Sequence, residues 1–259
     1  MAVCKVCENP LVLEVDDEDG NDEVQKVVPD DLETSCGCHF HWQCLLDQAA
    51  ELAISLKCPS CDSGLASNTA GPSVTNPFLQ SAPGAAILIR YTNEGGVQEN
   101  YDILPAITEE AYLEANPEAR PARAYHVMCS EGDVGGIVDL LRDAEQTEED
   151  ELMMNAAQLI RYQDPLGGSK SGLHLAVEKG QEEVVWLLLW IASTLGTGAF
   201  PGPAVQEAQA MGIERPSTLA SDDIRALTDN QGRTAEAVAA QMGGLWTTIL
   251  ESGALHPGS

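Results

Sequence analysis

The stretch Cys36-Gly37-Cys38-His39-Phe40-His41-Trp42-Gln43-Cys44 decides the fold of the N-terminal region, because it concentrates thiol and imidazole side chains in nine residues. On its two sides lie the pairs Cys4-Lys5-Val6-Cys7 and Cys58-Pro59-Ser60-Cys61, separated from it by 28 and 13 residues. The remaining cysteine, Cys129, stands alone. Closely spaced cysteine pairs in a chain without a secretory signal are typical of zinc sites rather than of disulfides. We therefore expect metal ions to organise this region.

The cysteines and one histidine form four half-sites, each with two potential ligands: Cys4/Cys7, Cys36/Cys38, His41/Cys44 and Cys58/Cys61. A tetrahedral zinc ion takes four such ligands, so four half-sites complete two closed sites with no position for a catalytic water. The expected cofactors are therefore two structural Zn²⁺ ions, and no residue is expected to be catalytic. His39 could replace Cys38, but His39 and His41 would then leave no room for the turn between them.

This order of ligands resembles the RING finger family, whose members fold as a small zinc-binding α+β cross-brace. The resemblance implies that one zinc ion is bound by the first and third half-sites, Cys4, Cys7, His41 and Cys44. The second zinc ion would then be bound by Cys36, Cys38, Cys58 and Cys61. Leu45–Leu56, rich in Leu and Ala, corresponds to the short helix that the family places before the last half-site. The acidic stretch Pro10–Ser35 is expected to be a solvated, mobile loop.

The order of four cysteines, one histidine and three cysteines is shared with plant homeodomain fingers and with the RING-CH subgroup. Plant homeodomain fingers usually have a longer spacer before the histidine and an aromatic residue two positions before the last pair. Here the spacer is two residues and that position is Leu56. The pattern favours a RING-type finger, and a plant homeodomain-like reader of histone tails is kept as an alternative.

RING fingers typically recruit a ubiquitin-conjugating enzyme and catalyse ubiquitin transfer by positioning, without a covalent intermediate. In the family, an apolar residue of the first knuckle and a proline of the last one contact that enzyme, and Val6 and Pro59 match these positions. Ile54 is assigned to the third docking position, since no aromatic residue occurs between Leu45 and Lys57. Many active members carry Arg or Lys after the last ligand, where this chain has Asp62, which cannot donate a hydrogen bond when ionised.

The rest of the chain is expected to contain a linker, a hairpin and a helical region. Residues 66–86 are rich in Ser, Ala, Pro and Gly and are interpreted as a flexible linker. Residues 87–118 are expected to form a β-hairpin around Asn93-Glu94-Gly95-Gly96 and a connecting helix. Because two strands are rarely stable alone, we expect this hairpin to pack against the residues that follow.

A degenerate repeat follows, in which a helix-length segment ends at Gly132, Gly180 or Gly243 and a second apolar segment begins directly afterwards. Gly172-Leu173-His174-Leu175-Ala176 resembles the signature of the ankyrin repeat, so residues 119–255 are expected to form ankyrin-like repeats, a mainly α-helical solenoid. The spacings of 48 and 63 residues require long insertions, the second over Thr194–Ser221, which are candidates for partner recognition. The alternative is an irregular helical bundle.

Four side chains in this region have expected structural roles. His174 should make structural hydrogen bonds, and Cys129 should be a small buried apolar residue. Trp186 and Trp190 should fill the core rather than line a ligand pocket.

The chain has 259 residues with 41 acidic and 13 basic side chains, which gives a formal net charge of −28. This excess argues against direct binding of nucleic acid or of an anionic membrane, because both need Lys and Arg, but it suits a basic partner. The N-terminus has no basic head followed by an apolar run, and the longest apolar run is too short for a membrane span. We therefore expect a cytoplasmic or nuclear protein, or one present in both.

Residues 1–65 are thus expected to be a RING-type finger that recruits a ubiquitin-conjugating enzyme, and the repeats are expected to bind a protein substrate, for which the net charge suits a basic protein. The alternative is a non-catalytic acidic adaptor or escort of a basic client, such as a ribosomal protein or a histone. No phosphate-binding, dinucleotide-binding or serine-nucleophile motif is present in the sequence.

Overall fold

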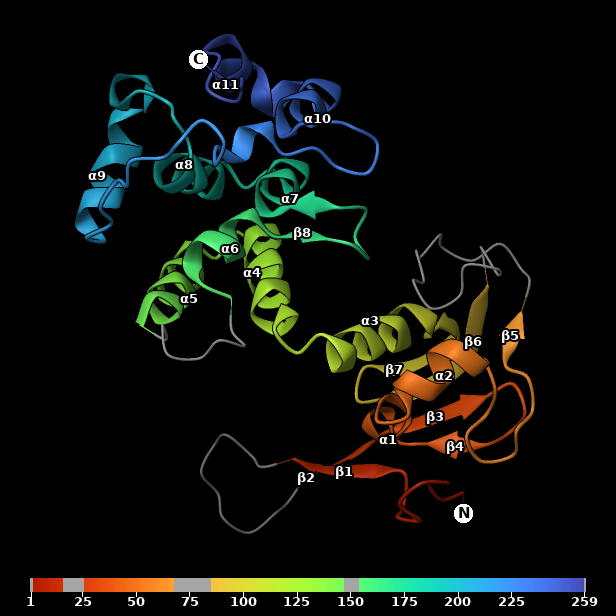
Figure 1. Ribbon diagram of the computed structural model, residues 1–259. Helices are drawn as coiled ribbons and strands as arrows, with labels where there is room; N and C mark the ends of the chain where they lie inside the picture. The colour runs from red at the N-terminus through yellow and green to blue at the C-terminus, as the bar shows by residue number, and fades with distance from the viewer. Residues whose placement is uncertain (1, 16–25, 68–84, 147–153, 259) are drawn as a thin grey trace. The chain divides into compact units, whose positions relative to one another are not determined.

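The computed structural model describes residues 2–15, 26–67, 85–146 and 154–258 (Figure 1). The chain divides into two compact units, Met1–Asn116 and Pro117–Ser259, and each has its own cluster of buried apolar side chains. None of the helices in the described ranges is long and apolar enough to cross a lipid bilayer.

The first unit contains two antiparallel sheets. Strands β1 (Val12–Val15) and β2 (Lys26–Pro29) pair with each other. The larger sheet consists of β3 (Asp31–Thr34), β4 (His39–Phe40), β5 (Ala66–Ser67), β6 (Ala86–Asn93) and β7 (Gly96–Asp102). In this sheet β6 pairs with β3, with β5 and with β7.

The hairpin of β6 and β7 forms around the predicted turn, with Asn93 opposite Gly96, and it has more packing partners than we expected. Strand β6 packs on α3 (Leu104–Ala115), which follows the hairpin, and it also joins the sheet of β3 and β5, where Leu32 lies opposite Tyr91 and Ala66 lies opposite Ile87. A lone hairpin is marginally stable in water, and this pairing gives β6 hydrogen-bonded neighbours and a buried face. The finger and the hairpin therefore belong to one unit, and the part of the expected linker at 68–84 lies outside the described residues.

The expected mobile loop at Pro10–Ser35 is structured where it is described, since it contributes β1, β2 and β3. Residues 16–25 of this stretch lie outside the described residues. Strand β3 is fixed by two neighbours, β4 and β6, and buries Leu32.

The single helix expected at Leu45–Leu56 is divided into α1 (Trp42–Leu46) and α2 (Ala49–Ser55). The break occurs because the Gln48 N–H bonds to the Leu45 carbonyl, three residues back, at 3.0 Å, which tightens the turn. Helix α3 (Leu104–Ala115) packs on α2 and buries Ile107 and Ala111 in the core of the first unit.

The second unit is mainly helical. Its α-helices are α4 (Ala119–Glu131), α5 (Val134–Gln146), α6 (Ala156–Arg161), α7 (Gly172–Lys179), α8 (Glu182–Ala192), α9 (Gly202–Ala210), α10 (Ala235–Met242) and α11 (Thr247–Glu251). Short 3₁₀ turns occur at Thr197–Ala199, Ile224–Ala226 and Gly244–Trp246, and strands β8 (Gln163–Asp164) and β9 (Lys170–Ser171) form a small hairpin.

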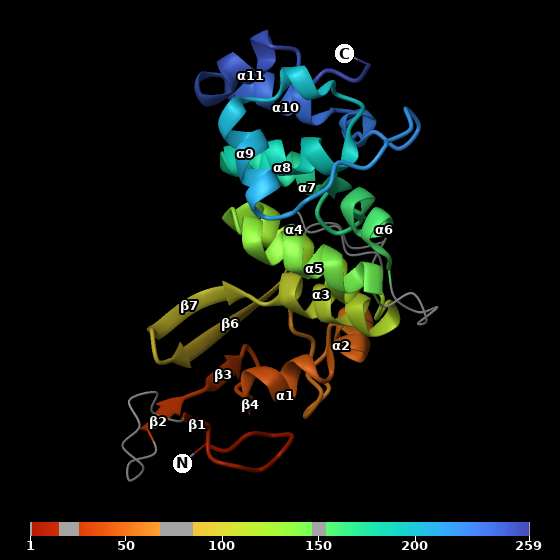
Figure 2. The same ribbon diagram turned by 90° about the vertical axis from the view of Figure 1, so that its left-hand side faces the viewer.

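The three predicted helix pairs are present as α4/α5, α7/α8 and α10/α11. Gly132 and Gly180 end the first helix of their pairs at φ angles of 86° and 76°, a left-handed backbone that glycine adopts without strain. Figures 1 and 2 show α7 between α4 and α10, and it packs against both. Gly172 allows the close approach to α4, because a Cβ atom there would lie 2.6 Å from the Tyr125 hydroxyl oxygen.

The insertion at Thr194–Ser221 is more ordered than a loop, because it forms helix α9, which packs against α8. Arg215, near its end, places its guanidinium 4.7 Å from the centroid of the Phe200 ring. The two other roles expected in this unit are confirmed: Cys129 is fully buried, and His174 makes structural hydrogen bonds.

Candidate metal centre

All eight predicted ligands lie in two groups of four in the first unit. Within each group the ligand atoms lie within 4.8 Å of one another. Group one consists of Cys4, Cys7, His41 and Cys44, and group two consists of Cys36, Cys38, Cys58 and Cys61. The structure thus brings the first half-site together with the third, and the second together with the fourth. This is the interleaved arrangement of ligands that the sequence analysis expected.

The opening and closing cysteine pairs have the same backbone geometry. The residue after each pair, Glu8 or Asp62, has a left-handed backbone with a φ of 64° or 61°. Its N–H donates to the carbonyl of the first cysteine, at 3.0 Å for Cys4 and 2.9 Å for Cys58. Such tight turns aim backbone N–H groups at the cysteine sulfurs, so both pairs are built to hold thiolates.

In group one, the His41 ring has a defined hydrogen-bonding state. Its Nε2 lies 2.8 Å from the Pro10 carbonyl oxygen, which can only accept a hydrogen bond, so Nε2 carries the proton. The other nitrogen, Nδ1, lies 3.3 Å from the Cys7 sulfur and 3.7 Å from the Cys44 sulfur. Zinc bonds of about 2.0–2.3 Å in a tetrahedron would separate such ligand atoms by about 3.5–3.8 Å. The spacing fits a zinc ion, and the Pro10 contact orients the ligating ring.

In group two, the sulfurs of Cys61 and Cys36 are 3.5 Å apart. Gly37 turns the chain between Cys36 and Cys38 at a φ of 78°, where a residue with a Cβ atom would be strained. The ring of His39 instead contacts the Asp31 carboxylate at 2.7 Å. Cys38, rather than the alternative His39, therefore lies in group two.

Burial, crowding and hydrogen bonds shift the pKa values of the clustered thiols in both directions. Burial and then the neighbouring Cys4 and Cys7 raise the pKa of Cys44 to about 12. Burial also raises the pKa of Cys58 to about 12, although backbone N–H groups oppose the change. Hydrogen bonds from Ser63 lower the pKa of Cys61 to about 6. Crowded sulfurs cannot all ionise by themselves, whereas a divalent cation among them would stabilise every thiolate.

Both groups therefore fit zinc by donor type, by spacing and by electrostatics. Each could hold one Zn²⁺ ion with four protein ligands, and such a closed site supplies folding energy rather than a bound water for hydrolysis.

The structure leaves the three predicted docking residues at the surface. Val6, in the opening turn, is 44% exposed, and Ile54, on α2, is 61% exposed. Pro59, in the closing turn, lines a groove of about 430 Å³ between α2 and this turn, and neither Val6 nor Ile54 lines that groove. The Asp62 carboxylate at its rim lies 3.5 Å from the Lys57 amino group.

Sequence reasoning missed Asp30, a buried carboxylate that bonds to Trp42, the residue after the predicted ligand His41. Asp30 is buried, accepts the backbone N–H of Trp42 at 3.2 Å and accepts the Tyr91 hydroxyl at 3.0 Å. Burial and then Asp30 raise the pKa of Tyr91 to about 12. The Asp30 side chain thus links β6, through Tyr91, to the start of α1, through Trp42. Nothing in the sequence distinguishes Asp30 from the other acidic residues nearby.

Comparison of the chain with protein-family models, with curated proteins and with solved structures found no match. The interpretation of the two groups as zinc sites therefore rests on their geometry and donor chemistry.

Proposed function

We propose that the first unit is a RING-type cross-brace finger and that the protein is a RING-type E3 ubiquitin ligase. The observation that carries this proposal is the interleaving of two closed sets of four ligands, which matches the ligand pairing of that family. In this proposal the first unit recruits a ubiquitin-conjugating enzyme and the second unit binds the protein substrate.

The finger acts by holding the enzyme–ubiquitin conjugate in a reactive arrangement, so it needs a docking surface rather than a nucleophile. The exposure of Val6, Ile54 and Pro59 supports such a surface, because apolar side chains in water are available to a partner. The cytoplasm or the nucleus is the compartment in which such a ligase would act.

We further propose that the second unit is built from ankyrin-like repeats. The His174 ring accepts the N–H of Ser171 at 3.3 Å through Nδ1 and donates to the Arg233 carbonyl at 2.9 Å through Nε2. The Asn230 N–H donates to the Gly168 carbonyl at 2.8 Å. These hydrogen bonds join two successive turn segments and support a repeating arrangement, in which inserted segments bind partners.

The test is autoubiquitination by the full, zinc-loaded chain with a panel of ubiquitin-conjugating enzymes. We expect ubiquitin chains with at least one enzyme and a loss of about tenfold or more in rate for Val6→Ala, because the apolar anchor of the docking surface is removed. Val127→Ala is the matched control, since Val127 is an exposed valine of the second unit. No activity with any enzyme, or equal effects of the two variants, would reject the ligase proposal.

The second candidate is a non-catalytic acidic adaptor or escort of a basic client such as a ribosomal protein or a histone. It is favoured by the net charge of −28 and by Asp62, which stands where many ligases carry a cationic donor. Capture of a basic client that is unaffected by Val6→Ala and weakens steeply with salt would support it.

The plant homeodomain-like reader shares the ligand order of this finger and is tested separately. A titration of histone-tail peptides against the full chain and a Pro59→Ala variant would show finger-dependent binding if this alternative is correct. Binding that is absent, or that is unchanged by the variant, would eliminate it.

A further inference from the structure

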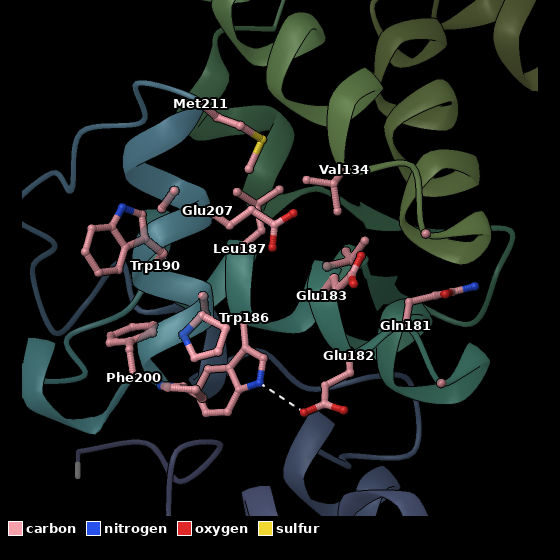
Figure 3. A pocket seen from close by; sticks show the side chains of 17 residues that line it. Val134, Gln181, Glu182, Glu183, Trp186, Leu187, Trp190, Phe200, Glu207 and Met211 are labelled. Carbon is pink, nitrogen blue, oxygen red and sulfur yellow. Dashed lines mark hydrogen bonds between the residues drawn. The ribbon is translucent and has the colours of Figure 1, made fainter.

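The second unit contains a cleft of about 600 Å³ between α8 and the inserted segment that carries α9 (Figure 3). Its walls combine aromatic side chains, Trp186, Trp190 and Phe200, with the carboxylates of Glu182, Glu183 and Glu207. As expected, Trp190 is a buried member of the core and Trp186 packs against it, and both rings in addition line this cleft. The insertion creates the cleft, because Phe200 and Glu207 both belong to it.

The three aromatic rings contact one another and differ in their other neighbours. Phe200 packs edge-on against Trp186 at 5.8 Å and against Trp190 at 5.2 Å between ring centroids. Trp190 and Phe200 both lie next to the Arg215 guanidinium, so each already has a cation beside its ring. Trp186 has no such neighbour among the described residues, and its indole N–H donates to Glu182 at 3.3 Å, which fixes the ring (Figure 3).

Among the described residues, all the charged side chains that line this cleft are acidic. Its described lining contains three glutamates and no lysine, arginine or histidine. A neighbouring cavity of about 630 Å³ shows that this is not a general property of the unit, because it is lined by Arg142, Arg161 and Arg215 together with Glu145, Glu214 and Asp222.

Two carboxylates of the acidic cleft remain available for a ligand. The side chains of Glu183 and Glu207 have no hydrogen-bond or ion-pair partner among the described residues, whereas Glu182 accepts the Trp186 indole N–H. Cationic groups of a bound ligand would gain charge pairing with these carboxylates and a cation–π contact with the Trp186 ring.

We infer that this cleft binds a basic peptide segment of a client protein, with its lysine or arginine side chains against the Trp186 ring and the glutamate carboxylates. Charge complementarity selects this occupant, since an acidic peptide would meet three carboxylates and an uncharged peptide would leave them unpaired. The inference builds on the proposed client-binding role of the second unit, but it does not depend on ubiquitin transfer.

The test is fluorescence anisotropy with the full, zinc-loaded chain and a labelled peptide in which Lys and Arg alternate with Ala and Gly. The variant Glu183→Gln/Glu207→Gln removes two charges from the cleft with little change in shape. The control variant Glu145→Gln/Glu214→Gln removes two charges from the neighbouring cavity. Trp186→Leu removes the ring and keeps an apolar side chain, and urea unfolding of each variant verifies that it is folded.

We expect saturable binding by the native chain, weakening of about tenfold for the cleft pair and for Trp186→Leu, and a change below about twofold for the control pair. A peptide with Gln in place of Lys and Arg should not bind. Absence of saturable binding, equal weakening by both glutamate pairs, or equal binding of the Gln peptide would overturn the inference. Because the assay contains no conjugating enzyme, its failure is distinguishable from failure of the ligase proposal, which is measured by autoubiquitination alone.

Discussion

The two units of this chain are held together by different physical means. The first unit gathers eight ligand residues into two closed groups around a small apolar core. The second unit contains no group of metal-ligating side chains among its described residues and relies on a larger apolar core and on buried ion pairs. Closed metal sites add folding energy to the smaller apolar core of the first unit, whereas the stacked helix pairs of the second unit bury more apolar surface.

The largest expected difference between the two units is their response to the removal of metal. We expect a strong chelator at neutral pH to unfold the first unit, because each structural zinc ion contributes on the order of 10 kcal/mol of apparent binding energy. The second unit should keep its helices and a cooperative thermal transition. The measurement is circular dichroism together with tryptophan fluorescence, in which Trp42 reports the first unit and Trp186, Trp190 and Trp246 report the second. Loss of both units at the same chelator concentration would contradict this separation.

Substitution of single cysteines should change the zinc content only when the cysteine belongs to the first unit. We expect Cys58→Ser to reduce the zinc content from two ions per chain to one or fewer, because a member of group two is lost. The matched control Cys129→Ser changes a buried cysteine of the second unit and should leave two ions bound. Zinc is measured by elemental mass spectrometry. A full complement of zinc in Cys58→Ser would show that this cysteine is not a ligand.

Loss of one partner of the buried ion pair in the second unit should lower the free energy of unfolding far more than loss of one partner of an exposed pair in the first unit. Arg225 is fully buried beside Asp223, and its guanidinium also donates to the Ala254 carbonyl at 3.2 Å. Asp223→Ala leaves this cation without its partner, and we expect a loss of about 3–5 kcal/mol in the free energy of unfolding. Arg90→Ala removes an exposed partner of Glu99 and should cause no measurable change. Urea unfolding of both variants measures the difference, and equal losses would contradict it.

Acidic pH should lower the stability of the second unit, because this unit buries a neutral histidine. Burial lowers the pKa of His126 to about 4, so the folded state keeps the ring neutral while the unfolded state takes up a proton near pH 6.5. Stability is therefore complete above pH 6.5 and is lost as the pH falls toward 4, by at most about 3 kcal/mol. Burial also lowers the pKa of His174, which acts in the same direction.

The measurement is urea unfolding followed by fluorescence at pH 7 and at pH 5, for the native chain and for His126→Gln. The variant should lose less stability than the native chain between these two pH values, since it lacks the titrating ring. An identical loss in both proteins would assign the pH dependence to other groups.

The sequence predicted the parts of the structure that depend on local spacing. A cysteine pair such as Cys4 and Cys7 binds one metal ion only across a tight turn, and glycines such as Gly132 and Gly180 end helices, so the half-sites and the helix pairs could be located in advance, whereas the pairing of the half-sites came from the family resemblance. These features depend on a few neighbouring residues and on backbone geometry alone.

The parts that could not be predicted depend on contacts between distant segments. The pairing of β6 with β3 joins residues about sixty positions apart, and alternation along β6 does not reveal its partner. Asp30 is one acidic residue among many, and only the fold places it beneath Tyr91. In the same way, the contact of Trp186 with Phe200 depends on how the insertion lies against α8.

The central claim is that the two metal sites are interleaved, and X-ray absorption at the zinc edge of a Cys7→Ala variant tests it most directly. Interleaving assigns Cys7 and His41 to the same site, so loss of that site should leave one zinc ion bound by four sulfurs and no histidine nitrogen. If neighbouring half-sites shared a metal ion instead, the remaining zinc would be bound by three sulfurs and the nitrogen of His41. That spectrum would contradict the account.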